Sequence, residues 1–359
     1  MQEINNIFQR AEKLREQSLY PESIKLFRKA LQKYKNLRDI LGILHCSLSL
    51  GDTYRMIGNF DLASKHYTYS IECAKKIDAP LAVPDAQVGL GLSLRAQGKW
   101  EDALKLIRKA RRTYKKHADR DGTAFTLWAE AGALRIKGDI IGAIKVYKES
   151  YSMFKALRDQ HGAGYALCGL GGTTRIAGSF RDSKKYYETA NKLFSEQNDT
   201  FGKAYSFCGI GNAYRMLNDY ERALRNFTKA TTLYKKIGDK VSYSYTLWGL
   251  GMTYTLIGNN RKAREFFIRS KKLFQNTKDP RGIIYCRLGL GQLSLIAGRA
   301  VPAKNDIGSS FTESMHHGFR IEACHANILL SFMNGKRDVR CYNNLGLKLR
   351  FQGLPLNIP

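Results

Sequence analysis

The sequence predicts an all-α protein, a solenoid of about eight helix-turn-helix repeats closed by a pair of C-terminal helices. Three observations lead to this prediction. An arginine recurs every 40 residues, a glycine or asparagine follows it at a constant distance, and apolar residues recur at a helical spacing of three and four. The alternation of apolar and polar residues that is typical of strands is almost absent.

The arginine column marks the period, because its members are 40 residues apart without a slip. It consists of Arg15, Arg55, Arg95, Arg135, Arg175 and Arg215, and Thr255 and Leu295 occupy the next two positions. Three residues after most of these positions stands a glycine or an asparagine, for example Gly58 and Asn218. Such a residue tolerates the left-handed backbone of a helix C-terminus, so the first helix of each repeat is expected to end there.

The second helix of each repeat carries the pattern A-x-x-x-[YF]-x-x-[AS], which keeps its small and large apolar residues on one face. The loop that closes the repeat contains a recurring aspartate, as in LRDILG and ADRDG. An aspartate in this place is suited to cap the N-terminus of the next helix.

The two ends of the chain depart from the pattern. The first repeat lacks the glycines (FQRAEKLREQ), as expected of a polar N-terminal cap. Near the C-terminus, FRIEACHANILLSFMNG predicts a closing helix, and 338–350 is expected to form a last helix over the open end. The predicted domains are therefore a solenoid over 1–318 and capping helices with a tail over 319–359. An alternative is that LPLNIP, at 354–359, reaches into a neighbouring molecule.

The composition favours an acidic partner. Lys and Arg number 59 against 31 Asp and Glu, which gives the 359 residues a net charge of +28. No stretch approaches the roughly 18 apolar residues that span a membrane, and the N-terminus lacks the apolar core of a secretory signal. Seven scattered cysteines indicate a reducing compartment. A cytoplasmic protein is therefore expected.

The stretch LGDTYRMIGNFDLASKHYTYS (50–70) resembles the tetratricopeptide repeat, and the resemblance covers roughly 1–318. The usual repeat of this family has about 34 residues. The longer repeat is similar to those of kinesin light chains, Pins-type polarity scaffolds and Rap-type peptide-sensing regulators. The resemblance implies a right-handed superhelix, a concave groove lined by the first helices, and a binding scaffold more than an enzyme.

We number each first helix so that Gly51, Gly91 and Gly171 stand at position 8. Positions 2, 5, 6, 9, 12 and 13 then share the face that the family turns to the groove. The partner-binding candidates are Arg55, Arg95, Phe125, Trp128, Arg135, Tyr165, Arg175, Tyr205, Arg215, Tyr245, Trp248 and Tyr285. Arginine makes forked contacts to carboxylate or phosphate, so an anionic ligand is expected over repeats 2–6. The alternative is that the arginines only complement helix dipoles or form salt bridges with Asp61, Glu101 or Glu221.

Position 6 carries an unusual glycine in five repeats: Gly89, Gly169, Gly209, Gly249 and Gly289. A glycine inside a helix costs about 0.5–1 kcal/mol relative to alanine. The first interpretation is that an aromatic ring of a neighbouring repeat packs there, and the second is that a ligand does. Pins-type scaffolds carry asparagines at positions 6 and 9 that hold an extended peptide backbone. Here position 6 is glycine and position 9 is mixed, which puts such clamping in doubt.

Evidence for catalysis or metal binding is slight. Glu130 stands at position 7, where the other copies carry Leu or Ile, and a structural salt bridge is its first interpretation. The second is a proton-handling acid in a pocket with Trp128 and Asp85. His316, His317, Cys324, His325 and Cys341 lack the spacing of a metal site, so neither a metal nor a cofactor is expected.

The predicted function is that of a non-enzymatic scaffold whose groove binds an acidic, partly apolar segment of a partner protein. One alternative is a solenoid that binds RNA or single-stranded nucleic acid by charge and stacking. Another is a groove that encloses a small amphiphilic anion and could act on it.

Overall fold

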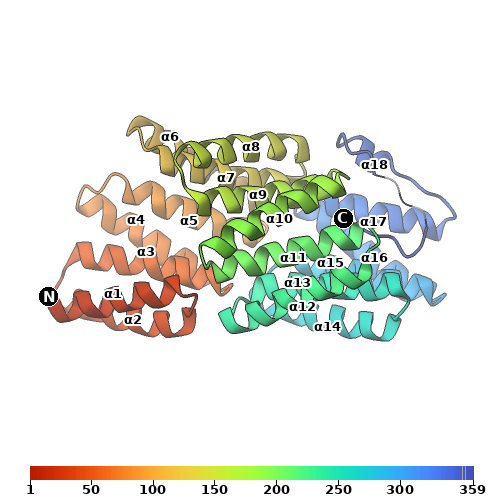
Figure 1. Ribbon diagram of the computed structural model, residues 1–359, viewed down its shortest axis with the longest axis horizontal. Helices are drawn as coiled ribbons and strands as arrows, with labels where there is room; N and C mark the ends of the chain where they lie inside the picture. The colour runs from red at the N-terminus through yellow and green to blue at the C-terminus, as the bar shows by residue number, and fades with distance from the viewer. Residues whose placement is uncertain (350, 352) are drawn as a thin grey trace.

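The computed structural model describes residues 1–349, 351 and 353–359. In these residues the chain forms eighteen helices and no strand (Figure 1). The first sixteen helices pair in chain order: α1 (Gln2–Glu16) with α2 (Tyr20–Asn36), α3 (Ile40–Met56) with α4 (Phe60–Lys76), α5 (Ala82–Ala96) with α6 (Trp100–Lys116), α7 (Arg120–Lys137) with α8 (Ile140–Ala156), α9 (Gln160–Ile176) with α10 (Phe180–Glu196), α11 (Thr200–Met216) with α12 (Tyr220–Ile237), α13 (Lys240–Ile257) with α14 (Asn260–Thr277), and α15 (Pro280–Ile296) with α16 (Ala300–His316). The all-α solenoid of eight repeats is confirmed.

The predicted helix boundaries are also confirmed, because the residues that set them act locally. Most of the marker glycines, from Gly58 to Gly298, have φ between 68° and 90°, a backbone that other residues rarely adopt. Aspartates of the repeat-closing loops cap the following helices through backbone N–H groups. Asp119, for example, accepts from Gly122 at 2.7 Å, and Asp199 from Gly202 at 2.8 Å.

The C-terminal end differs in part from the prediction. The closing helix forms as α17 (Arg320–Met333), but a helix over 338–350 is wrong, since α18 spans only Arg340–Asn343. Gly346 has φ 71°, and the alternating burial of Leu347 and Leu349 fits an extended chain rather than a helix. Residue 350 lies outside the described residues.

The glycines at positions 6 and 8 of the first helices make room for the aromatic rings of the second helices. The ring of Tyr187 lies between Gly171 of its own repeat and Gly209 of the next. A Cβ atom would stand 2.7 Å from this ring at Gly171 and 2.1 Å from it at Gly209. Tyr67, Phe227 and Phe267 are held between glycine pairs in the same way. The packing interpretation of the position-6 glycines is therefore confirmed.

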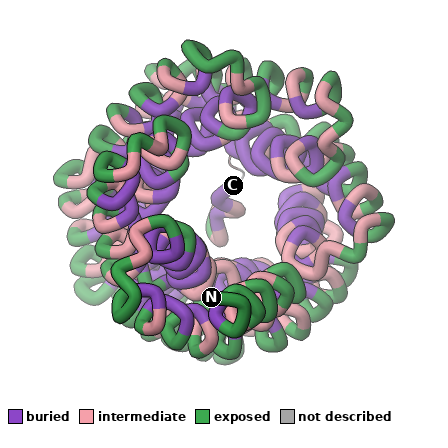
Figure 2. Tube along the Cα trace, turned by 90° about the vertical axis from the view of Figure 1, so that its left-hand side faces the viewer, coloured by how far each residue is buried: buried purple, intermediate pink, exposed green. Residues whose placement is uncertain are grey.

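The right-handed superhelix closes upon itself, so its second turn rests on its first. The Trp100 indole donates to the carbonyl of His317 at 2.9 Å, and Lys278 pairs with Asp61 at 2.6 Å. Both pairs are 217 residues apart, which is between five and six repeats of 40. Viewed end-on, the helices form a ring, and the C-terminus lies inside it (Figure 2). We call the space inside this ring the lumen.

Candidate functional site

The lumen is lined by the first helices of the repeats. At its N-terminal end a pocket of about 410 Å³ is bordered by residues of α1, α3, α5 and α7, together with rings from α4 and α6. Its lining includes Arg15, Asp52, Arg55, Asp85 and Phe125. Residues at equivalent positions of successive repeats therefore face one space, as the repeat register requires.

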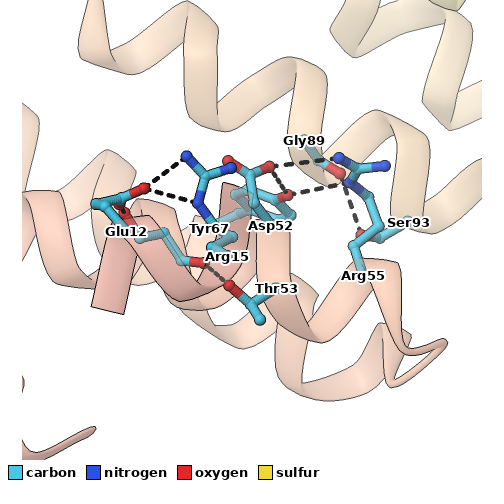
Figure 3. Close-up of polar contacts among 9 residues, drawn as sticks. Glu12, Arg15, Asp52, Thr53, Arg55, Tyr67, Gly89 and Ser93 are labelled. Carbon is cyan, nitrogen blue, oxygen red and sulfur yellow. Dashed lines mark hydrogen bonds and ion pairs between the residues drawn. The ribbon is translucent and has the colours of Figure 1, made fainter. Parts of the chain in front are cut away.

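The arginines at this end are paired with carboxylates (Figure 3). Arg15 contacts Glu12 at 2.6 Å. The Arg55 Nε donates to the Tyr67 hydroxyl at 3.3 Å, and that hydroxyl donates to Asp52 at 2.6 Å. The Arg55 Nη2 lies 3.5 Å from the same aspartate. The charge of this part of the lumen is therefore largely compensated.

Further along the lumen, the surroundings of the arginines are different. Within the described residues, Arg95, Arg135 and Arg175 have no acidic partner. Asp61, one of the expected partners, pairs with Lys278, and Glu221 pairs with Arg225. Burial first, and then the charge of Arg135, lower the pKa of both Arg95 and Arg175. In the part of the chain that the structure describes, the Arg135 Nε and the Arg175 Nε and Nη1 are buried without a hydrogen-bond partner.

The glycines at position 9 make room for two of these side chains. A Cβ atom on Gly132 would stand 2.1 Å from the Arg95 Nη1, and a Cβ atom on Gly172 would stand 2.6 Å from the Arg135 Nη1. Each of these arginines thus extends along the lumen onto the first helix of the next repeat. The arginine column is therefore continuous through the middle of the protein, because each of these guanidinium groups lies against the first helix of the next repeat.

The aromatic candidates form two groups. In the first, Phe125 stacks on Trp128 with ring centroids 5.6 Å apart, and the Trp128 Nε1 donates to the carbonyl of Tyr165 at 3.2 Å. In the second, the Trp248 Nε1 donates to the carbonyl of Tyr285, also at 3.2 Å. Phe125 is 39% exposed, whereas Trp248 and Tyr285 are each 5% exposed. Of the other candidates, Tyr205 and Tyr245 are half-buried.

An arginine lies over each of these two tryptophans. Arg95 is 5.6 Å from the Trp128 ring centroid, and Arg215 is 5.4 Å from that of Trp248. The two pairs are 120 residues apart (248 − 128 and 215 − 95), which is three repeats. They differ in one respect, because Arg95 is half-buried and Arg215 is completely buried.

The residues that bury Arg215 come from the end of the chain. We call 353–359 the tail, and it lies inside the lumen of its own solenoid (Figure 2) rather than in a neighbouring molecule. The Arg215 Nη1 donates to the Asn357 Oδ1, and its Nη2 donates to the carbonyl of Ile358 at 3.0 Å. Burial and the charge of Arg175 lower the pKa of Arg215 to about 9, so it stays charged at neutral pH.

Gln292, at position 9 of its helix, was not among the candidates. Its amide accepts from the backbone N–H of Leu356 at 2.6 Å and donates to the carbonyl of the same residue at 3.3 Å. At this one position, therefore, an amide side chain holds the backbone of a single residue of the chain's own tail. The signal was present in the sequence, since position 9 also carries an amide at Asn212, which accepts from Arg215 at 3.2 Å.

The two weak catalytic candidates are not brought together. Glu130 accepts from the Arg108 Nε at 2.8 Å and lies 2.5 Å from the Arg111 Nη1, both on α6, and it does not border the pocket. It forms the structural salt bridge that was its first interpretation. Asp85 borders the pocket and accepts a hydrogen bond from the Tyr114 hydroxyl. Burial raises the pKa of Asp85.

The cysteines near the C-terminus are covalently paired. Cys324 and Cys341 form a disulfide that ties α18 to α17, with their Cα atoms 5.4 Å apart. The expectation of reduced cysteines throughout is therefore wrong for this pair in the structure. The Nδ1 of the neighbouring His325 lies 2.6 Å from the Tyr342 hydroxyl. Among the described residues, no group of three or more metal-binding side chains is found.

Comparisons with known proteins agree with the repeat fold. The profile of the tetratricopeptide repeat family matches residues 83–156 and 163–236. The structure is similar to that of a Rap protein complexed with competence and sporulation factor, with 13% identity, a TM-score of 0.68 and 96% of this chain and 97% of that chain covered. It is also similar to NprR in complex with its cognate peptide NprX, with 14% identity, a TM-score of 0.59 and coverage of 92% and 98%.

A third similar structure is that of aspartyl phosphate phosphatase F from Bacillus subtilis, with 14% identity, a TM-score of 0.52 and coverage of 98% and 97%. At these identities the likeness shows the fold. A search of curated protein sequences found no match. Among the described residues, no helix has the length and apolar character needed to cross a bilayer.

Proposed function

Since the chain is a tetratricopeptide repeat protein with long repeats, we propose that it is a non-enzymatic peptide-binding scaffold. Its lumen would hold an acidic, partly apolar segment of a partner protein. NprR, which shares its fold, was solved in complex with its cognate peptide, and the Rap protein of this fold was solved with competence and sporulation factor; this supports the proposal.

The observation that carries the proposal is the row formed by Arg95, Arg135 and Arg175. In the described residues no carboxylate neutralises them, and three of their nitrogens are buried without a partner. An uncompensated buried charge is costly, so a ligand carboxylate placed among these guanidinium groups would gain both charge neutralisation and forked hydrogen bonds.

The apolar part of the ligand has a place beside this row. Phe125, Trp128 and Tyr165 follow one another along the lumen, and Phe125 is exposed. Exposed aromatic rings beside arginines are typical of the residues that dominate binding energy at protein interfaces. We therefore expect the ligand to carry apolar side chains next to its acidic ones.

The test compares two triple variants that lose the same charge. The lumen variant carries Arg95→Gln, Arg135→Gln and Arg175→Gln. The matched control carries Arg112→Gln, Arg181→Gln and Arg264→Gln, three exposed arginines of second helices. Each protein is purified gently from its own cells, and bound molecules are identified by native mass spectrometry. A peptide or protein that is lost only from the lumen variant supports the proposal.

Two other results would replace it. The net charge of +28 favours the nucleic-acid alternative. Nucleic acid that is lost equally from both variants and released steeply by salt would support that alternative. A small bound anion that is lost only from the lumen variant would favour the amphiphilic ligand instead.

We propose that this scaffold works in the cytoplasm, although the Cys324–Cys341 disulfide of the structure is a bond that a reducing cytoplasm would open. Alkylation of intact cells before lysis should then add mass to both cysteines. A pair that stays disulfide-bonded and unalkylated would overturn this location.

A further inference from the structure

We propose that Gln292, Arg215 and Trp248 form a peptide subsite that recognises a tightly turned segment with an asparagine between two apolar residues. The chain's own tail fills this subsite, and a free segment of the same pattern must displace it. The inference deepens the proposed function by naming a second ligand class and an internal competitor for the lumen, and it rests on the lumen being a peptide-binding space.

The first contact is with the peptide backbone. The Gln292 side-chain amide bonds both the N–H and the carbonyl of Leu356, at 2.6 Å and 3.3 Å. Paired bonds to the N–H and carbonyl of one residue hold the peptide backbone there whatever its side chain. With the tail in place Gln292 is 1% exposed, and the tail supplies the partners of both of its amide atoms.

The second contact is with the side chain of Asn357. Arg215 donates to the Asn357 Oδ1, and the Asn357 Nδ2 donates to the backbone carbonyl of Arg215 at 2.9 Å. This reciprocal pair uses both the donor and the acceptor of the asparagine amide. An aspartate at this place would keep the acceptor and add a charge pair with Arg215, but it would lack the donor to the Arg215 carbonyl; a leucine or an alanine would lack both. The pair therefore distinguishes an asparagine from an apolar side chain.

The third contact is apolar. Leu356 is completely buried and Ile358 is 2% exposed, and both belong to the core cluster that includes Trp248 and Ile176. The Ile358 N–H donates to the Leu356 carbonyl at 3.1 Å, which makes a γ-turn centred on Asn357. Leu356 and Ile358 therefore flank the asparagine on either side of this turn, while its amide meets Arg215. The recognised pattern is therefore apolar, asparagine, apolar.

The tail is tethered close to this subsite and so competes strongly with a free segment. A short tether gives an effective concentration on the order of 1 mM. A free segment with a Kd of about 100 µM for the empty subsite would then bind the intact chain about tenfold more weakly, because the tethered copy occupies the subsite for most of the time.

The test uses the full chain and a fluorescent peptide of residues 353–359, GLPLNIP. Wild type is compared with a tail-released variant that carries Leu356→Asp and Ile358→Asp. We expect the released variant to bind the peptide about tenfold more tightly than wild type in fluorescence anisotropy. The matched control peptide carries Asn357→Ala and should bind the released variant at least about tenfold more weakly than GLPLNIP.

Two results would overturn the proposal. Equal affinity of wild type and the released variant would mean that the tail does not occupy the subsite. Absence of binding to a folded released variant would mean that the subsite does not recognise this pattern. A further substitution in the released protein, Gln292→Met, should abolish binding without disturbing the fold, because Met252 occupies the same position one repeat earlier.

If the released variant does not fold, hydrogen exchange of the tail amides in the wild-type protein provides a second test. The Leu356 amide donates to the Gln292 side chain, and the Ile358 amide donates to the Leu356 carbonyl. Both amides should therefore exchange slowly, and fast exchange would overturn the proposal. The tail peptide carries no acidic side chain. Its binding should therefore survive Arg95→Gln and Arg135→Gln, so a failure of the proposed acidic ligand and a failure of this subsite can be told apart.

Discussion

The ring of Tyr187 lies against the backbone of Gly209, one repeat further along, with no room for a side chain between them. A Cβ atom on Gly209 would fall 2.1 Å from the ring, which is well inside van der Waals contact. The same relation joins Tyr67 to Gly89 and Phe267 to Gly289. Neighbouring repeats are therefore stacked through ring-on-backbone contacts, and their spacing depends on glycine.

Gly209→Ala should lower the free energy of unfolding by about 1–3 kcal/mol, because the added methyl group must push the Tyr187 ring aside. Gly308→Ala is the matched control. Gly308 also lies inside a helix, but no atom approaches within 4 Å of the place of its Cβ. Alanine there should stabilise the protein by about 0.5–1 kcal/mol through helix propensity. Urea unfolding of both variants measures the difference, and a Gly209→Ala protein as stable as the control would contradict the packing argument.

Arg175→Gln should leave stability unchanged or raise it by about 0.5–1 kcal/mol, because two nitrogens of Arg175 are buried without a partner in the described structure and the change removes a charge that costs desolvation. Arg55→Gln should destabilise, since Arg55 contacts Asp52 and Tyr67. Thermal unfolding in the absence of ligand distinguishes the two. If Arg175→Gln destabilised the protein as much as Arg55→Gln, the arginine column would only stabilise the ends of the helices.

Glu130→Leu should be close to neutral for stability, and Glu130→Gln should be the more damaging change. Leucine restores the apolar residue that most other repeats carry at position 7. An apolar residue of similar size often replaces a buried ion pair without loss. Glutamine would stay buried while losing the charge that meets Arg108 and Arg111. Chemical unfolding of the two variants measures the order, and the reverse order would show that the salt bridge stabilises the fold.

Acidification should weaken the C-terminal end of the solenoid through His325. Burial first, and then the charges of Arg281, Arg175 and Arg215, lower its pKa from 6.5 to about 3. Above pH 6.5 the histidine is neutral in both states. Below it, the unfolded chain binds a proton that the folded protein excludes. The free energy of unfolding should therefore fall by about 1.4 kcal/mol per pH unit between pH 6.5 and 3.

His325→Asn tests this pH dependence, because asparagine can still bond the Tyr342 hydroxyl but does not titrate. Stability measured at several pH values should fall less steeply for the variant than for wild type. The remaining slope belongs in part to His66, whose pKa burial and the charge of Lys35 lower to about 4. Identical slopes for variant and wild type would exclude His325 as a source.

Much of the fold was predictable because its signals are local. A positive φ at Gly58 or Gly138 and a capping aspartate at Asp119 act within a few residues, and the 40-residue period repeats them. The predicted helix over 338–350 was wrong; this segment lies outside the repeats, so no second copy of its pattern supported the prediction. The disulfide of Cys324 with Cys341 was missed because α17 and α18 carry no shared periodic signal.

The sequence by itself determined the helices, their pairing and the side chains that face the lumen, since each depends on near neighbours and on a register that eight copies repeat. Only the tertiary structure decided that the superhelix closes over 217 residues, that Arg95, Arg135 and Arg175 stay without acidic partners in the described chain, and that Asn357 meets Arg215. The pitch of the superhelix is the sum of many small rotations between neighbouring repeats. No single repeat encodes that sum, so contacts between turns, and between the tail and the lumen, exist only once the whole coil has formed.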